Sequence, residues 1–81
     1  MSRSRLALLI HALDRFPRAT VAELAARLGA TPTTVRRDLA DLREAGLASA
    51  GYDLKRTDLV RRVLAIVARD PEALRALLER E

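Results

Sequence analysis

The feature that most constrains the fold of this chain is a segment in which two amphipathic helices are expected on either side of a tight turn. Thr20 and Glu23 have the spacing of a capping box, which predicts a helix that begins at Val21. Gly29 is expected to end this helix, because glycine tolerates the left-handed conformation of a sharp exit and adds no side chain against the next helix. The turn therefore covers residues 29–31.

The second helix of the pair has its own start signal. Thr31 followed by Pro32 is an N-cap with proline at the first helical position, and it predicts a helix over residues 32–45 that Gly46 closes. Its apolar residues recur at spacings of four and three, which gives one buried stripe. The stripe consists of Val35, Leu39 and Leu42. The residues left on the outward side of the first turns are Thr33, Thr34, Arg36, Arg37 and Ala40. A helix in the major groove of DNA presents such N-terminal residues to base edges.

Two levels of resemblance rest on these residues. Ala25, Gly29 and Val35 match the general helix-turn-helix pattern. The run over residues 34–39 is more specific, since a hydroxyl residue, a branched apolar residue, two arginines, an aspartate and a leucine follow one another. This run resembles the DNA-binding segment of DeoR-type repressors, in which the same residue types open the recognition helix.

The resemblance covers roughly residues 3–56. It implies a winged helix-turn-helix fold, a mainly α architecture with a three-helix core, a short β-hairpin wing and one or two further helices toward the C-terminus. Two features of the family have no counterpart in the sequence, namely the basic, glycine-rich wing and the large sugar-phosphate-sensing domain. The fold therefore carries over, whereas a sugar-phosphate ligand does not.

The segments around the helix pair are expected to complete the winged helix. Residues 4–15 have one apolar face and form a supporting first helix, and residues 18–20 can form a short first strand. Residues 47–49 and 52–55 can pair across a two-residue turn. This hairpin would be a short, mostly structural wing.

The C-terminal part, residues 57–81, is expected to be a helical extension of a DNA-binding domain that covers residues 1–56. A helix over residues 58–68 has apolar residues on more than one face, and Pro71 begins a further helix. The extension is expected to dimerise the protein, and the alternative is that it folds back onto its own domain. The expected dimerisation residues are Leu59, Val63, Ile66, Val67, Leu74, Leu77 and Leu78.

The net charge of +4 becomes informative when it is divided along the chain. Residues 1–20 and residues 47–69 each carry +3, whereas residues 21–46 are neutral. Basic flanks suit contacts with phosphates, while a charge-balanced helix reads bases. The alternative interpretation is that alternating arginines and acids only solvate helix faces.

Within the second helix of the pair, Arg36 and Arg37 are the first choice for DNA contacts, because a guanidinium group binds guanine or phosphate in bidentate fashion. Asp38, Asp41 and Glu44 are expected to orient the arginines or to pair across the domain. The expected DNA-binding residues are Thr31, Thr33, Thr34, Arg36, Arg37, Ala40, Lys55 and Arg56.

The sequence offers little support for other functional classes. His11 is the single histidine, and no nucleophile set, metal-ligand spacing or phosphate loop accompanies it, so we expect no enzyme, no cofactor and no metal site. The lack of cysteine excludes disulfides and thiolate metal sites. No apolar run approaches membrane-spanning length and the N-terminus does not resemble a signal peptide, so a cytoplasmic location is expected.

The sequence therefore predicts a transcriptional regulator, a repressor or autoregulator, that binds double-stranded DNA as a homodimer on an inverted repeat. One alternative is a winged-helix module that binds a partner protein, which would favour an apolar outward face on the second helix. Another is an accessory DNA anchor for a separately encoded protein. The threonines and arginines on that outward face favour DNA.

Overall fold

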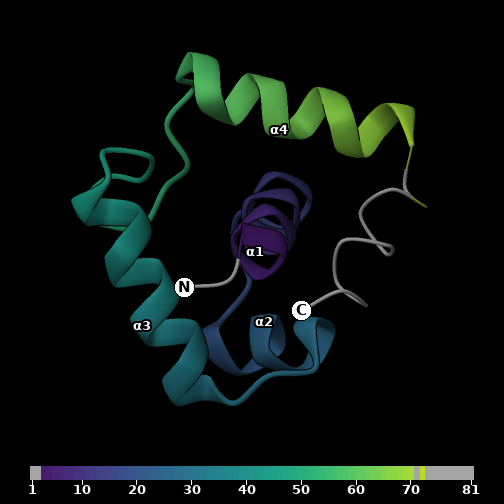
Figure 1. The fold of residues 1–81 in the computed structure, drawn as a ribbon. Coiled ribbons are helices and arrows are strands. Elements are labelled where there is room, and N and C mark those ends of the chain that lie inside the picture. Colours follow the sequence, from purple (N-terminus) through teal and green to yellow (C-terminus); the bar gives the residue numbers. More distant parts are fainter. Residues whose placement is uncertain (1–2, 71, 73–81) are drawn as a thin grey trace.

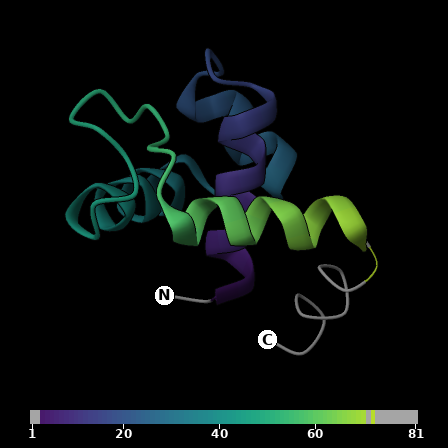
Figure 2. The ribbon, with the colours of Figure 1, turned by 90° about the horizontal axis from the view of Figure 1, so that it is seen from above.

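The computed structural model of the protein describes residues 3–70 and residue 72. The helices within them are α1 (Arg3–Arg15), α2 (Val21–Leu28), α3 (Pro32–Glu44) and α4 (Asp58–Arg69). α1 lies at the centre, and each of the other three helices packs against it (Figure 1). α2 and α3 also pack against each other, whereas α4 crosses α1 on a side that neither of them occupies (Figure 2). The predicted helical core is confirmed.

Both ends of α2 follow the local signals in the sequence. The backbone N–H of Glu23 donates to Thr20 Oγ1 at 3.1 Å, which caps the helix, and the Thr20 hydroxyl donates to Glu23 Oε1 at 3.2 Å. Gly29 has φ 64°, in the left-handed region. A Cβ atom there would have no neighbour within 4 Å. The prediction that a side chain at this position would block the next helix is therefore wrong. Only the backbone conformation requires glycine at this position.

α3 begins at its predicted cap and ends one residue earlier than expected. The N–H of Thr34 donates to Thr31 Oγ1 at 3.2 Å, and Pro32 occupies the first turn. The helix ends at Glu44, and Gly46 follows with φ 78°. The chain therefore leaves α3 in the sharp turn that the glycine predicted.

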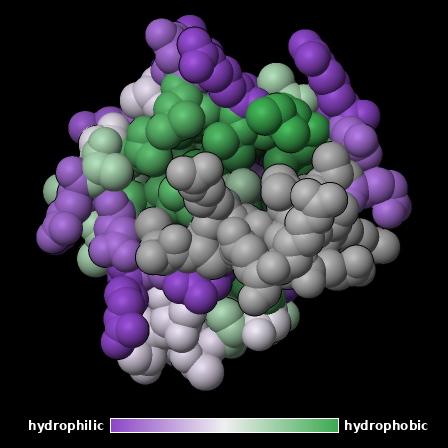
Figure 3. Space-filling model, viewed as in Figure 1, coloured by the Kyte–Doolittle hydropathy of each residue, from purple (hydrophilic) through white to green (hydrophobic). Residues whose placement is uncertain are grey.

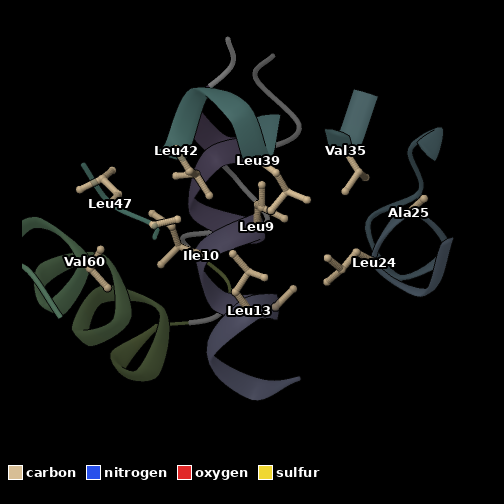
Figure 4. Packing of buried hydrophobic residues seen from close by; sticks show 12 residues of the cluster. Leu9, Ile10, Leu13, Leu24, Ala25, Val35, Leu39, Leu42, Leu47 and Val60 are labelled. Atoms are coloured by element: carbon tan, nitrogen blue, oxygen red, sulfur yellow. The ribbon is translucent and has the colours of Figure 1, made fainter. Parts of the chain in front are cut away.

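The hydrophobic core lies where the four helices meet. Leu9, Leu42 and Val60 are completely buried, and each contributes about 1.5–3 kcal/mol of hydrophobic stabilisation. In the close view, the α1 side chains occupy the middle, with Val60 of α4 on one side and Leu24 of α2 on the other (Figure 4). The predicted stripe of α3 is buried in this core. The core thus holds α3 by one face and leaves its other face exposed.

The predicted β-hairpin wing is not present in the described part of the chain. Residues 47–55 form a single antiparallel bridge between Ala48 and Leu54 in place of two strands. The physical reason is composition, since this segment has no β-branched residue and is rich in alanine, serine, glycine and aspartate, which disfavour strands. Ser49 Oγ accepts the N–H of Asp53 at 3.1 Å and closes the loop as a tight turn.

Residues 18–20 are not a strand either. The N–H of Ala19 donates to the Phe16 carbonyl at 3.1 Å, and Thr20 is occupied as the cap of α2. With no strand to pair with among the described residues, this segment is a short turn between α1 and α2. The further helix expected from Pro71 lies outside the described residues, as do Leu74, Leu77 and Leu78.

Candidate nucleic-acid interface

The orientation of α3 is held by an ion pair as well as by its apolar face. Asp38 is only 2% exposed, although it carries a carboxylate. Arg5 Nε donates to Asp38 Oδ2 at 2.5 Å, and Arg5 Nη2 donates to Oδ1 at 3.1 Å. This two-point contact joins α1 to α3 across the domain, and it is one of the two roles expected for Asp38. Arg5 could not be identified from the sequence pattern, because nothing local marks a partner 33 residues away.

The outward face of α3 carries the residues expected to contact DNA. Thr33, Arg37 and Ala40 follow one another at spacings of four and three, on the side opposite the buried stripe. Arg36 lies at the edge of this row. Thr33 and both arginines are exposed, and Ala40 is half-buried. The structure therefore brings these four residues together on one surface of one helix.

Arg36 and Arg37 have no ion pair and no ring contact with any residue that the structure describes. Their neighbour Asp38 does not neutralise them, because its carboxylate points inward to Arg5. Ten donor N–H groups on two adjacent guanidinium groups are thus presented to solvent. This arrangement fits an anionic or hydrogen-bond-accepting ligand.

Other arginines are engaged within the domain. Arg27 lies over the Phe16 ring, with its guanidinium carbon 3.6 Å from the ring centroid. Arg43, near the end of α3, lies 5.8 Å from the centroid of the Tyr52 ring. Both distances are within the range of cation–π attraction. Arg27 and Arg43 thus contact aromatic rings of the domain, whereas Arg36 and Arg37 do not.

The two basic residues expected near the wing differ from each other. Lys55 is exposed, and its N–H donates to the Leu47 carbonyl at 2.9 Å, which ties its backbone to the loop after α3. Arg56 Nη1 donates to Asp14 Oδ1 at 2.7 Å. Its charge is therefore partly matched by α1, while its side chain stays 56% exposed. Arg56 has a structural role beside any contact with phosphate.

The start of α3 uses part of its polar groups for its own cap. The Thr31 hydroxyl accepts from the Thr34 N–H and donates to Thr34 Oγ1 at 3.0 Å. Thr34 keeps its own hydroxyl hydrogen, which can donate to a phosphate oxygen. Toward the other end of α3, Asp41 and Glu44 add negative charge. The exposed hydroxyl and guanidinium groups of Thr33, Arg36 and Arg37 lie in the first two turns of the helix.

Within the described residues, no group of three or more histidine, aspartate or glutamate side chains is placed to hold a metal ion. The described helices are also too short or too polar to cross a membrane.

The arrangement of α2, a tight glycine turn and α3, supported by α1, defines a helix-turn-helix domain, the class of protein that binds duplex DNA through its second motif helix. A family model described as the DeoR-like helix-turn-helix domain matches residues 5–57, and the chain belongs to this family. The match covers most of α1, all of α2 and α3, and the loop that follows them, and it implies a DNA-binding regulator. Comparisons with curated proteins and with solved structures gave no significant match.

Proposed function

We propose that the protein is a sequence-specific transcriptional regulator, a repressor or autoregulator, that reads the major groove with α3. The observation that carries this proposal is the pair of exposed arginines without partners in the first turns of α3. The protein acts as a dimer on an inverted repeat, with half-sites separated by about one turn of DNA, roughly 10 base pairs. This role requires a cytoplasmic location with access to the chromosome, as expected from the sequence.

The side chains divide into two groups by the chemistry they offer. Arg37 and Thr33 occupy the middle of the outward face and read base edges, the arginine through guanine O6 and N7 and the threonine through the methyl group of thymine. Arg36, at the edge of that face, reaches a base or the adjacent phosphate. Thr31, Thr34, Ala40, Lys55 and Arg56 complete the interface. Hydroxyl and basic groups in this second set hold phosphates and fix the register of the helix.

The first experiment is selection of duplexes from a random DNA pool with the full chain, followed by affinity measurements on the enriched sequence. We expect the double variant Arg36→Ala/Arg37→Ala to lose about 2–6 kcal/mol of specific binding free energy, at about 1–3 kcal/mol for each lost base contact. The variant should fold, since both side chains are exposed.

A matched control is the double variant Arg15→Ala/Arg18→Ala, which removes the same charge from exposed positions at and after the end of α1, outside α3 and α4. We expect this control to enrich the same motif as the unmodified protein, with at most a uniform decrease in affinity across sequences. If the α3 double variant enriches the unchanged motif at unchanged affinity, α3 is not the reading helix. If the unmodified protein enriches no motif, the regulator assignment fails and binding to a partner protein becomes the better explanation.

A further inference from the structure

α4 carries a second apolar stripe that the core of the subunit covers only at its middle, where Val63 is half-buried. Leu59, Val63 and Ile66 follow one another at spacings of four and three, which places them on one side of the helix. Leu59 is 52% exposed and Ile66 is 53% exposed. Val60 and Val67 lie on the neighbouring side and are buried. Val67 is therefore used by its own subunit, although the sequence grouped it with the dimerisation residues.

The stripe continues onto α1. Leu59 and Val63 line a hollow of about 380 Å³ together with Leu6, Ala7 and Ile10. Apolar side chains gather along α4 in the space-filling view (Figure 3). Large exposed apolar residues in a continuous patch mark a surface that another chain covers.

We propose, on the basis of the proposed function, that this stripe binds the same stripe of a second copy, with the two α4 helices antiparallel about a twofold axis near Val63. A twofold interface uses one patch twice, so the patch must be complementary to itself. The three stripe residues meet this condition, because reversal about the point between Arg62 and Val63 brings Leu59 of one copy against Ile66 of the other.

The charges beside the stripe favour the antiparallel direction. Asp58, Arg62, Ala65 and Arg69 form a row along one edge of the stripe, at spacings of four, three and four. In an antiparallel pair this row faces itself in reverse, so Asp58 lies opposite Arg69 of the second copy at both ends of the contact. Arg62 then lies beside the small Ala65, with room to extend into solvent. In a parallel twofold pair this row would face the opposite edge of the partner's stripe, so Asp58 and Arg69 of the two rows would not meet.

The position of α4 is compatible with DNA binding. α4 packs against α1 and lies away from α3 and its outward face (Figures 1 and 2). A second copy on the α4 stripe therefore leaves both reading helices uncovered. The contact is short compared with stable interfaces, which bury on the order of 1,200–2,000 Å². We expect a weak dimer that an inverted repeat strengthens, because DNA holds the two subunits at high effective concentration.

The test is sedimentation velocity of the full chain over a range of concentrations without DNA. We expect Ile66→Glu to raise the dimer dissociation constant at least tenfold, because a buried residue at the centre of an interface contributes at least this much to the affinity. Ala68→Glu is the matched control, because it adds a carboxylate to another side of α4, at an exposed position outside the stripe. We expect it to dimerise like the unmodified protein. Circular dichroism checks that both variants keep their helices.

Charge exchange tests the direction of the helices. Asp58→Arg and Arg69→Asp should each weaken the dimer, and the double variant should restore most of the affinity. Both exchanges oppose the dipole of α4, so restoration cannot come from a better helix. A double variant weaker than either single variant would overturn the antiparallel arrangement.

Two further outcomes would overturn the surface itself. One is an Ile66→Glu variant that dimerises normally. The other is an unmodified protein that stays monomeric while Ile66→Glu lowers its melting temperature, which would mean that residues 71–81 of the same chain cover the stripe. After either result, sequence-specific binding of a single half-site by the monomer would still support reading of DNA by α3. The dimer surface on α4 and the reading helix α3 are therefore tested independently.

Discussion

Replacing Arg5 with alanine is expected to destabilise the protein more than replacing its partner Asp38. The two residues differ in their access to water, since the side chain of Arg5 is 36% exposed and that of Asp38 is 3% exposed. Removal of Arg5 leaves a carboxylate buried without its two donors, whereas removal of Asp38 leaves a guanidinium group that can turn toward solvent. Breaking a buried ion pair is most costly when the charge left behind cannot reach water.

The expected magnitudes follow from this difference. A fully buried pair costs about 3–5 kcal/mol when one partner is removed, and the partial exposure of Arg5 reduces this to about 2–4 kcal/mol for Arg5→Ala. Asp38→Ala should cost about 1–2 kcal/mol, because it loses the two hydrogen bonds but leaves no buried charge. A domain of this size has a stability of roughly 4–10 kcal/mol, so Arg5→Ala removes a large share of it.

The assay is urea unfolding of the two single variants and of the double variant Arg5→Ala/Asp38→Ala, followed by far-ultraviolet circular dichroism. We expect the double variant to be more stable than Arg5→Ala alone, since the second change removes the unpaired carboxylate. Arg15→Ala, an exposed arginine in the same helix, is the control and should change stability by less than about 0.5 kcal/mol. Additive effects of the two single changes would contradict a stabilising contact between Arg5 and Asp38, because residues that do not interact behave additively.

Two further predictions concern the turn between α2 and α3. Gly29→Ala should lower stability by about 1 kcal/mol, because a Cβ atom disfavours the left-handed conformation, whereas Gly51→Ala, at a position without positive φ, should be close to neutral in the same thermal unfolding measurement. An unchanged melting temperature for Gly29→Ala would contradict the role of φ at this turn. Thr31→Ala should lower the free energy of unfolding by about 1 kcal/mol, because the α3 cap is lost. Thr31→Ser should keep the stability of the unmodified protein, because the serine hydroxyl can also cap the helix. Equal stability of the alanine and serine variants in denaturant titrations would show that the hydroxyl does not cap the helix.

The candidate site could be predicted from the sequence to the extent that its signals are local. The cap at Thr31 and the stripe from Val35 to Leu42 together determine which side of α3 faces outward, and the structure has the arginines on that side. The engagement of Arg56 with Asp14 could not be predicted in this way, because 42 residues separate them. The wing was predicted from its turn residues, yet the composition of the segment allows only one bridge.

Local signals in the sequence set the ends of the described helices to within one residue, and they set which face of α3 is apolar, because caps, glycine exits and helical spacing act over three or four residues. Long-range packing, in contrast, buries Asp38 against Arg5, and it turns Val60 and Val67 of α4 inward while Leu59 and Ile66 stay exposed. Every one of these α4 residues is aliphatic, so hydrophobicity alone does not distinguish them. The crossing of α4 over α1 selects the side that is buried, and this crossing depends on contacts between residues far apart in the chain.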